Sequence, residues 1–137
     1  MIPQRLDADT ILVAPQAMTN SATVTANLDT LGASYATIRV ALASEINTNA
    51  IGPTLSLLES DDTVATNFAT VTANRTAEDI TDAASVTYGV DLRGRKRYLR
   101  LSVTTETTTN DNVTVSAVGT LSRQAEGGSG GDVTVNV

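Results

Sequence analysis

Tyr35-Ala36-Thr37-Ile38-Arg39-Val40-Ala41-Leu42 alternates apolar side chains with small or polar ones. Ile38, Val40 and Leu42 share one set of alternate positions, and the residues between them are Arg39 and Ala41. Successive side chains of a β-strand point to opposite faces of the sheet, so this spacing predicts a strand with one buried face.

The same two-residue period returns in residues 98–104 and 113–117. Weaker candidates of the same kind are residues 10–14, 22–26, 54–58, 68–73 and 85–90. Turn-forming residues separate these segments, as in residues 47–53 and 109–112. Residues 75–84 are a helical competitor, but they are short and barely amphipathic, so a turn or loop is favoured. About eight strands with this punctuation predict an all-β, antiparallel sandwich.

The composition agrees with a single β domain. The chain has 137 residues, a common size for one domain. Hydrophobic residues make up 41% and aromatic residues only 3%, while threonine occurs 23 times. Small and β-branched side chains suit half-buried strands.

The residues that most enzymes need are missing. The sequence contains no His, Cys or Trp, which removes the usual general base, the thiol nucleophile and the imidazole and thiolate metal ligands. A catalytic serine would need a lysine base, and the only lysine, Lys96, lies within a group of arginines. We therefore expect a non-enzymatic protein without a cofactor.

No apolar run approaches the length of a spanning helix, and the N-terminus lacks the basic and apolar pattern of a secretory signal. Synthesis in the cytoplasm and no membrane partner are therefore expected. The formal net charge of −6 also disfavours nucleic acid and anionic membranes as partners.

The two ends differ from the middle of the chain. Residues 1–20 are expected to form an N-terminal arm or a first strand, and residues 21–126 the sandwich domain. Residues 127–137 combine a glycine-rich linker with an alternating segment that contains Val133, Val135 and Val137. A strand on a flexible linker can add to a sheet edge of its own subunit or of a neighbour. The alternative is a frayed, valine-rich tail.

Glu59, Asp61 and Asp62 put three carboxylates into four positions after a predicted strand. Such a cluster could bind Ca²⁺ or supply a pair of catalytic carboxylates. The spacing does not match the calcium loop of twelve residues, which favours a solvated turn capped by Asp61 or Asp62.

Five of the nine basic residues gather around one predicted turn and the strand after it. They are Arg93, Arg95, Lys96, Arg97 and Arg100. One interpretation is a solvated hairpin whose charges prevent edge pairing. The other is a docking patch, in which arginines pair with carboxylates within or between subunits. Only Tyr98 is an aromatic neighbour, so base stacking has little support.

The order of several segments resembles the small head proteins of tailed bacteriophages that act as cement or decoration proteins. The resemblance covers about residues 28–125. Its sharpest parts are the strand that ends in Glu59-Ser60-Asp61-Asp62 and the turn Gly94-Arg95-Lys96-Arg97-Tyr98. Residues 29–32, 35–42 and 117–123 follow the same order.

The resemblance implies a jelly-roll-like β-sandwich with extended terminal arms. Such a protein assembles, commonly as a homo-trimer, on the outer surface of the phage head and clamps neighbouring major capsid subunits. The expected partners are the major capsid protein and further copies of the chain. The glycine-rich C-terminus departs from the shorter ending of the family.

Two other classes stay open. A β-sandwich recognition module of a fibre or surface protein would bind a host or a carbohydrate, and a structural tail or baseplate component has a similar composition. Sugar sites usually offer aromatic platforms, and one Phe, three Tyr and no Trp argue against the first.

Overall fold

The computed structural model describes residues 8–19, 22–45, 54–71, 75–76, 84–105, 112–122 and 133–136. In chain order its elements are β1 (Ala8–Met18), β2 (Thr23–Asp29), β3 (Tyr35–Glu45), β4 (Thr54–Ser60), a 3-10 turn η1 (Ala65–Asn67), β5 (Ala69–Thr70), β6 (Arg75–Thr76), β7 (Ala84–Asp91), β8 (Tyr98–Thr104), β9 (Asn112–Ser122) and β10 (Val133–Asn136). Within these ranges no helix is long and apolar enough to cross a bilayer.

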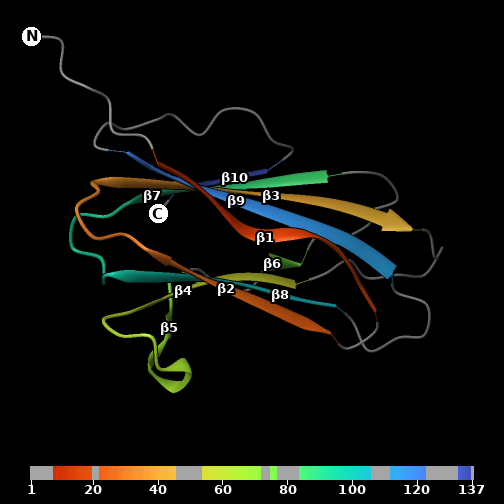
Figure 1. The fold of residues 1–137 in the computed structure, drawn as a ribbon, viewed down its shortest axis with the longest axis horizontal. Helices are drawn as coiled ribbons and strands as arrows, with labels where there is room; N and C mark the ends of the chain where they lie inside the picture. Colours follow the sequence, from red (N-terminus) through yellow and green to blue (C-terminus); the bar gives the residue numbers. More distant parts are fainter. Residues whose placement is uncertain are drawn as a thin grey trace, which may run out of the picture.

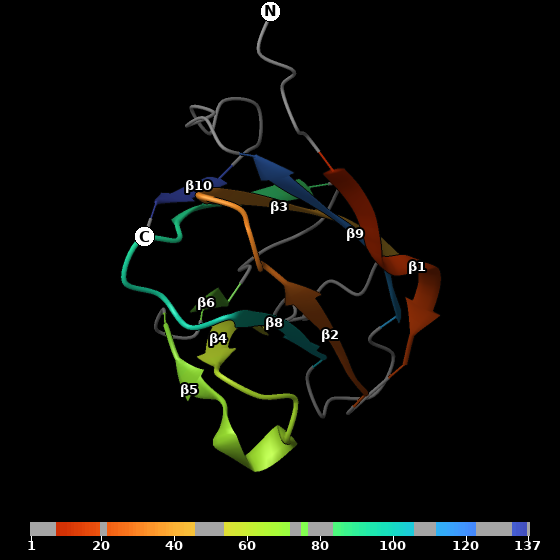
Figure 2. The ribbon, with the colours of Figure 1, turned by 60° about the vertical axis from the view of Figure 1, so that its left-hand side comes forward.

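The strands form two facing sheets (Figures 1 and 2). Sheet A has the order β1-β9-β3-β7-β10, and sheet B has the order β2-β8-β4-β5, with β6 also paired to β4. β5 and η1 project from sheet B on the side away from sheet A (Figures 1 and 2).

The pairing is nested, because strands of the first half of the chain pair with strands of the second half in reverse order. β1 pairs with β9, β2 with β8, β3 with β7, and β4 with β5 and β6, all antiparallel. Successive strands of each half alternate between the two sheets. This connectivity is that of a jelly roll, so the expected jelly-roll-like antiparallel sandwich is confirmed.

The core lies between the sheets and follows the alternation of the sequence. From sheet A, Ile38, Val40 and Leu42 are fully buried, and from sheet B, Leu99 and Val103 face them. The side chains between these positions point away from the core, which is why Arg39 is exposed. Tyr88 is the one aromatic side chain among the fully buried residues described.

The N-terminal strand belongs to the sandwich. β1 pairs with β9 from Ala8 opposite Leu121 to Met18 opposite Val113, and Val13 and Met18 are buried. The register shifts twice along this pair, first between Ile11 and Val13. Residues 8–18 thus form a strand of sheet A, and residues 1–7 lie outside the described part of the chain.

Among the described strands, β10 is the one that pairs in parallel. It lies at the edge of sheet A, where Val133 is opposite Val86 and Val135 is opposite Tyr88 of the same chain. Val137 lies outside the described residues.

Of the segment expected as a strand at residues 68–73, Ala69–Thr70 (β5) pairs with β4, and residues 72–73 lie outside the described residues. The 3-10 turn η1 lies directly before this short strand. Arg75–Thr76 (β6), at the start of the helical competitor, also pairs with β4. Most of the helical competitor, residues 77–83, lies outside the described part of the chain.

Candidate functional site

The basic residues gather at one end of the sandwich, on the turn between β7 and β8. Gly94 has a φ of 79°, a left-handed conformation that glycine adopts without strain. The Arg95 N–H donates to the Leu92 carbonyl at 3.1 Å, which closes the turn. The side chains on either side of Gly94 therefore spread over the end of both sheets.

Two of the arginines are held by aspartates in two-point contacts. Arg97 donates from Nε to one Asp29 oxygen at 2.9 Å and from a terminal nitrogen to the other at 2.8 Å. Arg93 makes the same kind of contact with Asp91, with Nε at 2.9 Å from Oδ1. These forks match the geometry that makes arginine–carboxylate pairs specific.

The hydrogen bonds from Arg93, first from its side chain and then from its backbone, lower the pKa of Asp91 to about 2. The side-chain hydrogen bond from Arg97 lowers the pKa of Asp29 in the same way. Both carboxyl groups are therefore charged at neutral pH and committed to their arginines.

Arg95 and Lys96 face the acidic cluster at the end of β4. Arg95 lies 3.8 Å from a Glu59 oxygen, and Lys96 Nζ lies 3.8 Å from an Asp61 oxygen. The backbone N–H of Lys96 also donates to Glu59 at 3.3 Å. The basic and acidic clusters of the sequence thus meet at this end of the molecule.

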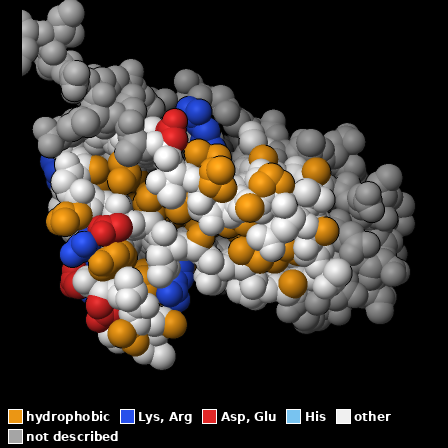
Figure 3. Space-filling model, in the orientation of Figure 1, with side chains coloured by type: hydrophobic (Ala, Val, Ile, Leu, Met, Phe, Trp, Pro, Cys, Tyr) orange, Lys and Arg blue, Asp and Glu red, His pale blue; other side chains and the backbone are white. Residues whose placement is uncertain are grey.

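Arg100 is engaged further along β8. Its Nε donates to Asn27 at 2.8 Å, and its guanidinium carbon lies 3.9 Å from the centre of the Phe68 ring. All five basic residues singled out from the sequence therefore have partners in their own chain. In Figure 3 blue and red side chains lie side by side over this end of the molecule. A contact of these residues with another subunit stays a prediction.

Asp62 acts as the cap of a turn. It accepts hydrogen bonds from the Val64 N–H and from Asn67 Nδ2, both at 2.9 Å, and its own N–H donates to Ser60 Oγ at 3.2 Å. The bond from Asn67, followed by that from Val64, lowers the pKa of Asp62. Among the described residues, no three groups of the metal-binding kinds lie close enough together to hold an ion.

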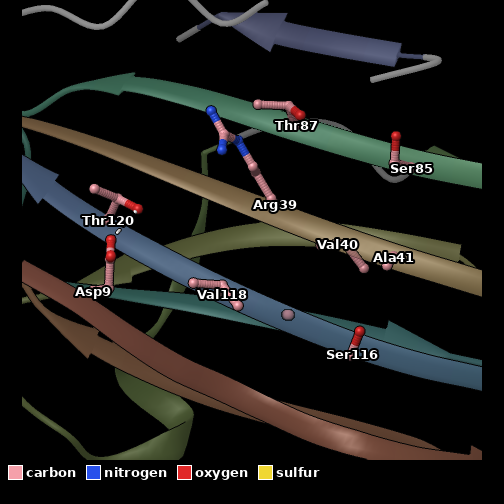
Figure 4. Close-up of a pocket in the computed structure, with 10 residues that line it drawn as sticks. Asp9, Arg39, Val40, Ala41, Ser85, Thr87, Ser116, Val118 and Thr120 are labelled. Atoms are coloured by element: carbon pink, nitrogen blue, oxygen red, sulfur yellow. Dashed lines mark hydrogen bonds between the residues drawn. The ribbon is translucent and has the colours of Figure 1, made fainter. Parts of the chain in front are cut away.

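A second surface was not singled out from the sequence. The outward side of sheet A, here called the outer face of sheet A, is hollowed into a shallow depression of about 420 Å³. Figure 4 shows Arg39 reaching from β3 towards Thr87 on β7, and Asp9 of β1 against Thr120 of β9. Thr87 is only 1% exposed, and its Oγ1 has no hydrogen-bond partner among the described residues. In the sequence, this surface is indicated by the strand positions that alternate with the core-facing ones.

No protein-family model and no curated protein matches the chain. Solved structures do match it. The VP2 subviral particle of infectious bursal disease virus aligns with 88% of this chain and 33% of its own, at a TM-score of 0.50 and 9% identity. The structure of the Gx strain of the same virus aligns with 87% and 32%, at a TM-score of 0.52 and 12% identity.

The chain thus spans about a third of the length of the viral chains that it resembles. At this identity the likeness concerns the fold alone.

Proposed function

We propose that the protein is a non-enzymatic capsid component of the cement or decoration type. It binds the outer surface of a tailed-phage head as a trimer and stabilises the contacts between major capsid subunits. The observation that carries the proposal is the nested jelly roll, shared with viral capsid chains and built here from small, unreactive side chains.

A protein of this kind works by adding buried area at the joints of a shell. Each contact can be modest, because repetition over the lattice multiplies its effect. The core is poor in aromatic residues and yields little apolar area per residue, so oligomerisation would add stability that the monomer lacks.

Two features of the chain support attachment to neighbours. β10 is a short strand at the edge of sheet A, paired only with β7 among the described strands. The same segment could pair with the edge of a neighbouring sheet through its main chain. The basic turn forms the second candidate contact, with Arg93 the most exposed of its paired side chains at 74%.

The decisive experiment mixes the purified protein with heads that lack it. We expect saturable binding and a higher resistance of the heads to heat and osmotic shock. The proposal would be overturned if heads neither bind the protein nor gain resistance. It would also be overturned if the protein is strictly monomeric and does not bind capsids.

Charge reversal at the basic turn tests the docking patch. Arg95→Asp with Arg97→Asp should weaken head binding in a salt-dependent way if these residues meet acidic partners. The reversal also places like charges beside Asp29 and Glu59, so a folding defect could mimic lost docking.

The exchanged pair Asp29→Arg with Arg97→Asp is the matched control, because it keeps an internal ion pair and changes only its direction. If the exchanged pair binds heads normally and Arg97→Asp alone does not, the defect lies in the lost ion pair with Asp29 and not in docking. If neither the simple reversal nor the exchanged pair changes head binding, the basic turn is a solvated hairpin.

The second candidate is a recognition module, since jelly rolls also occur in lectin domains. The aromatic rings argue against this alternative, because arginines cover two of them. Arginines lie over Phe68 at 3.9 Å and over Tyr98 at 4.9 Å, on faces where a sugar would stack. Binding to a glycan array without binding to heads would favour this alternative.

A further inference from the structure

The outer face of sheet A carries two opposite charges without an ion pair. Asp9 lies opposite Thr120 and Arg39 lies opposite Val118, so the two charged residues flank β9 from either side. Both side chains are exposed. Asp9 accepts a hydrogen bond from Thr120 at 2.8 Å, and within the described ranges neither charge meets an opposite one. Arg39 thereby differs from the arginines of the basic turn.

The surface between the two charges is apolar and forms part of the shallow depression on this face. Val118 and Ile11 lie side by side across β9 and β1, and they are 41% and 72% exposed. They are two of the four large hydrophobic side chains that are exposed in the described chain. The neighbouring outward positions hold small side chains, namely Ala41, Ala43, Thr114 and Ser116. Small side chains at these positions leave room for another surface to approach the face closely.

We propose that the outer face of sheet A binds a second copy of the chain through a twofold axis. The midpoint between Arg39 and Asp9 falls on β9, between Val118 and Thr120. The twofold axis passes through this midpoint, parallel to the face and perpendicular to the line from Arg39 to Asp9. It places Arg39 of one copy over Asp9 of the second copy, and Asp9 of the first over Arg39 of the second. In such a contact each surface is its own complement.

The two charges select this occupant over others. An acidic segment would be attracted by Arg39 and repelled by Asp9, and a basic one would meet the reverse. A surface that carries one charge of each sign in reciprocal positions satisfies both, and the chain itself has such a surface. The contact uses one face twice, whereas a threefold ring needs two different surfaces, so it goes beyond the proposed trimer.

The contact is small. Strands β1, β9 and β3, about 4.8 Å apart and with about seven residues of 3.3 Å each, cover roughly 330 Å² on each copy. β7 is left out because its outward Thr87 is buried. Stable interfaces bury about 800 Å² per partner, so we expect a reversible dimer with a dissociation constant in the micromolar range or weaker.

Crosslinking tests the axis, because the chain contains no cysteine and one substitution creates a unique thiol. With Val118→Cys, a short bismaleimide should link two copies at tens of micromolar protein. Thr25→Cys is the matched control, since Thr25 is equally a solvent-exposed strand residue but belongs to sheet B. Equal yields from both variants, or no dimer with Val118→Cys, would overturn the proposal.

Charge exchange tests the pairing, measured by sedimentation over a concentration series. Arg39→Asp and Asp9→Arg should each weaken self-association about tenfold or more, and the double variant should recover most of the loss. Thr25→Asp should leave it unchanged. A double variant no better than the single ones overturns the proposal, and thermal melts show whether each variant is folded.

The same variants in the head-binding assay keep the two proposals separate. Loss of the dimer with normal head binding leaves the cement function intact. If the Val118→Cys protein crosslinks but does not bind heads, the proposed dimer stands and the proposed cement function is overturned.

Discussion

Asp91 and Arg93 show how one pair of residues links the basic turn to pH. Arg93 lowers the pKa of Asp91 from 3.8 to about 2. A carboxyl group whose pKa is lower in the folded state stabilises the fold above its unfolded pKa, and this contribution is lost as the pH falls through the folded value. Both side chains are well exposed, so the effect on stability is small and the pKa itself is the better readout.

We expect Arg93→Ala to raise the pKa of Asp91 from about 2 towards 3.8, measured by NMR titration of the carboxyl carbon. Arg97→Ala is the control, because Arg97 pairs with Asp29 and not with Asp91. An Asp91 pKa that stays low without the Arg93 side chain would show that the backbone bond alone holds it.

Gly119 occupies a core-facing position of β9 where the two sheets come close. A Cβ atom there would lie 3.2 Å from Leu12 Cδ1 and 3.2 Å from Leu28 Cδ2. We expect Gly119→Val to lower the free energy of unfolding by about 1–3 kcal/mol through overpacking, measured by urea denaturation. Thr114→Val on the exposed side of β9 should change it by about 0.5 kcal/mol or less. Equal stability of the two variants would show that the leucines move aside.

Gly119 also explains where the sequence was hard to interpret. The predicted strand stopped at residue 117, whereas β9 continues to Ser122. A glycine at the inward position interrupts the apolar alternation, although Leu12 and Leu28 from other strands fill its place. The buried positions Ile38, Val40 and Leu42 were predictable, because they need only the local period.

The ion pairs of the basic turn could not be predicted residue by residue. Asp29 lies 68 positions before Arg97, and Glu59 lies 37 positions before Lys96. Only the order of the strands brings them together, and sequence spacing does not contain that order. For the same reason, the sequence does not predict that Asp9 and Arg39 lie on either side of β9.

Among the elements, β8 was predicted with its true bounds, and β3 and β7 were predicted to within a few residues. The alternation of β3 and β8 is strong because the core-facing positions of each are apolar, whereas that of β7 is weaker, and its outward Thr87 is also buried. β5 and β6 were not separable, since two-residue strands carry too little pattern to be recognised.

β10 is the element that the rest of the sandwich needs least. It is hydrogen-bonded to β7 alone and adds a fifth strand to a sheet that is already complete as part of a jelly roll. Truncation after Glu126 should therefore leave the fold in place and expose the edge of β7. Circular dichroism should show an unchanged β spectrum.

The same truncation should weaken head binding or trimer stability if β10 pairs with a neighbour. A truncated protein that binds heads with unchanged affinity would show that the segment has no role in attachment.

For the whole molecule, β9 is the strand that closes the sandwich. It lies between β1 and β3, and its removal would divide sheet A into two unconnected parts. A fragment that ends at residue 105 should therefore be unfolded by circular dichroism and amide NMR, although it retains the residues of eight strands, β1 to β8. A folded fragment would show that sheet B and β3–β7 suffice.

The nested pairing also sets when the protein can become active in a cell. The contact between Ala8 and Leu121 joins strands that are 113 positions apart in the chain. β1 therefore has no partner strand until β9 has been synthesised, and distant pairings of this kind fold slowly. A growing chain offers no finished outer face of sheet A before that point.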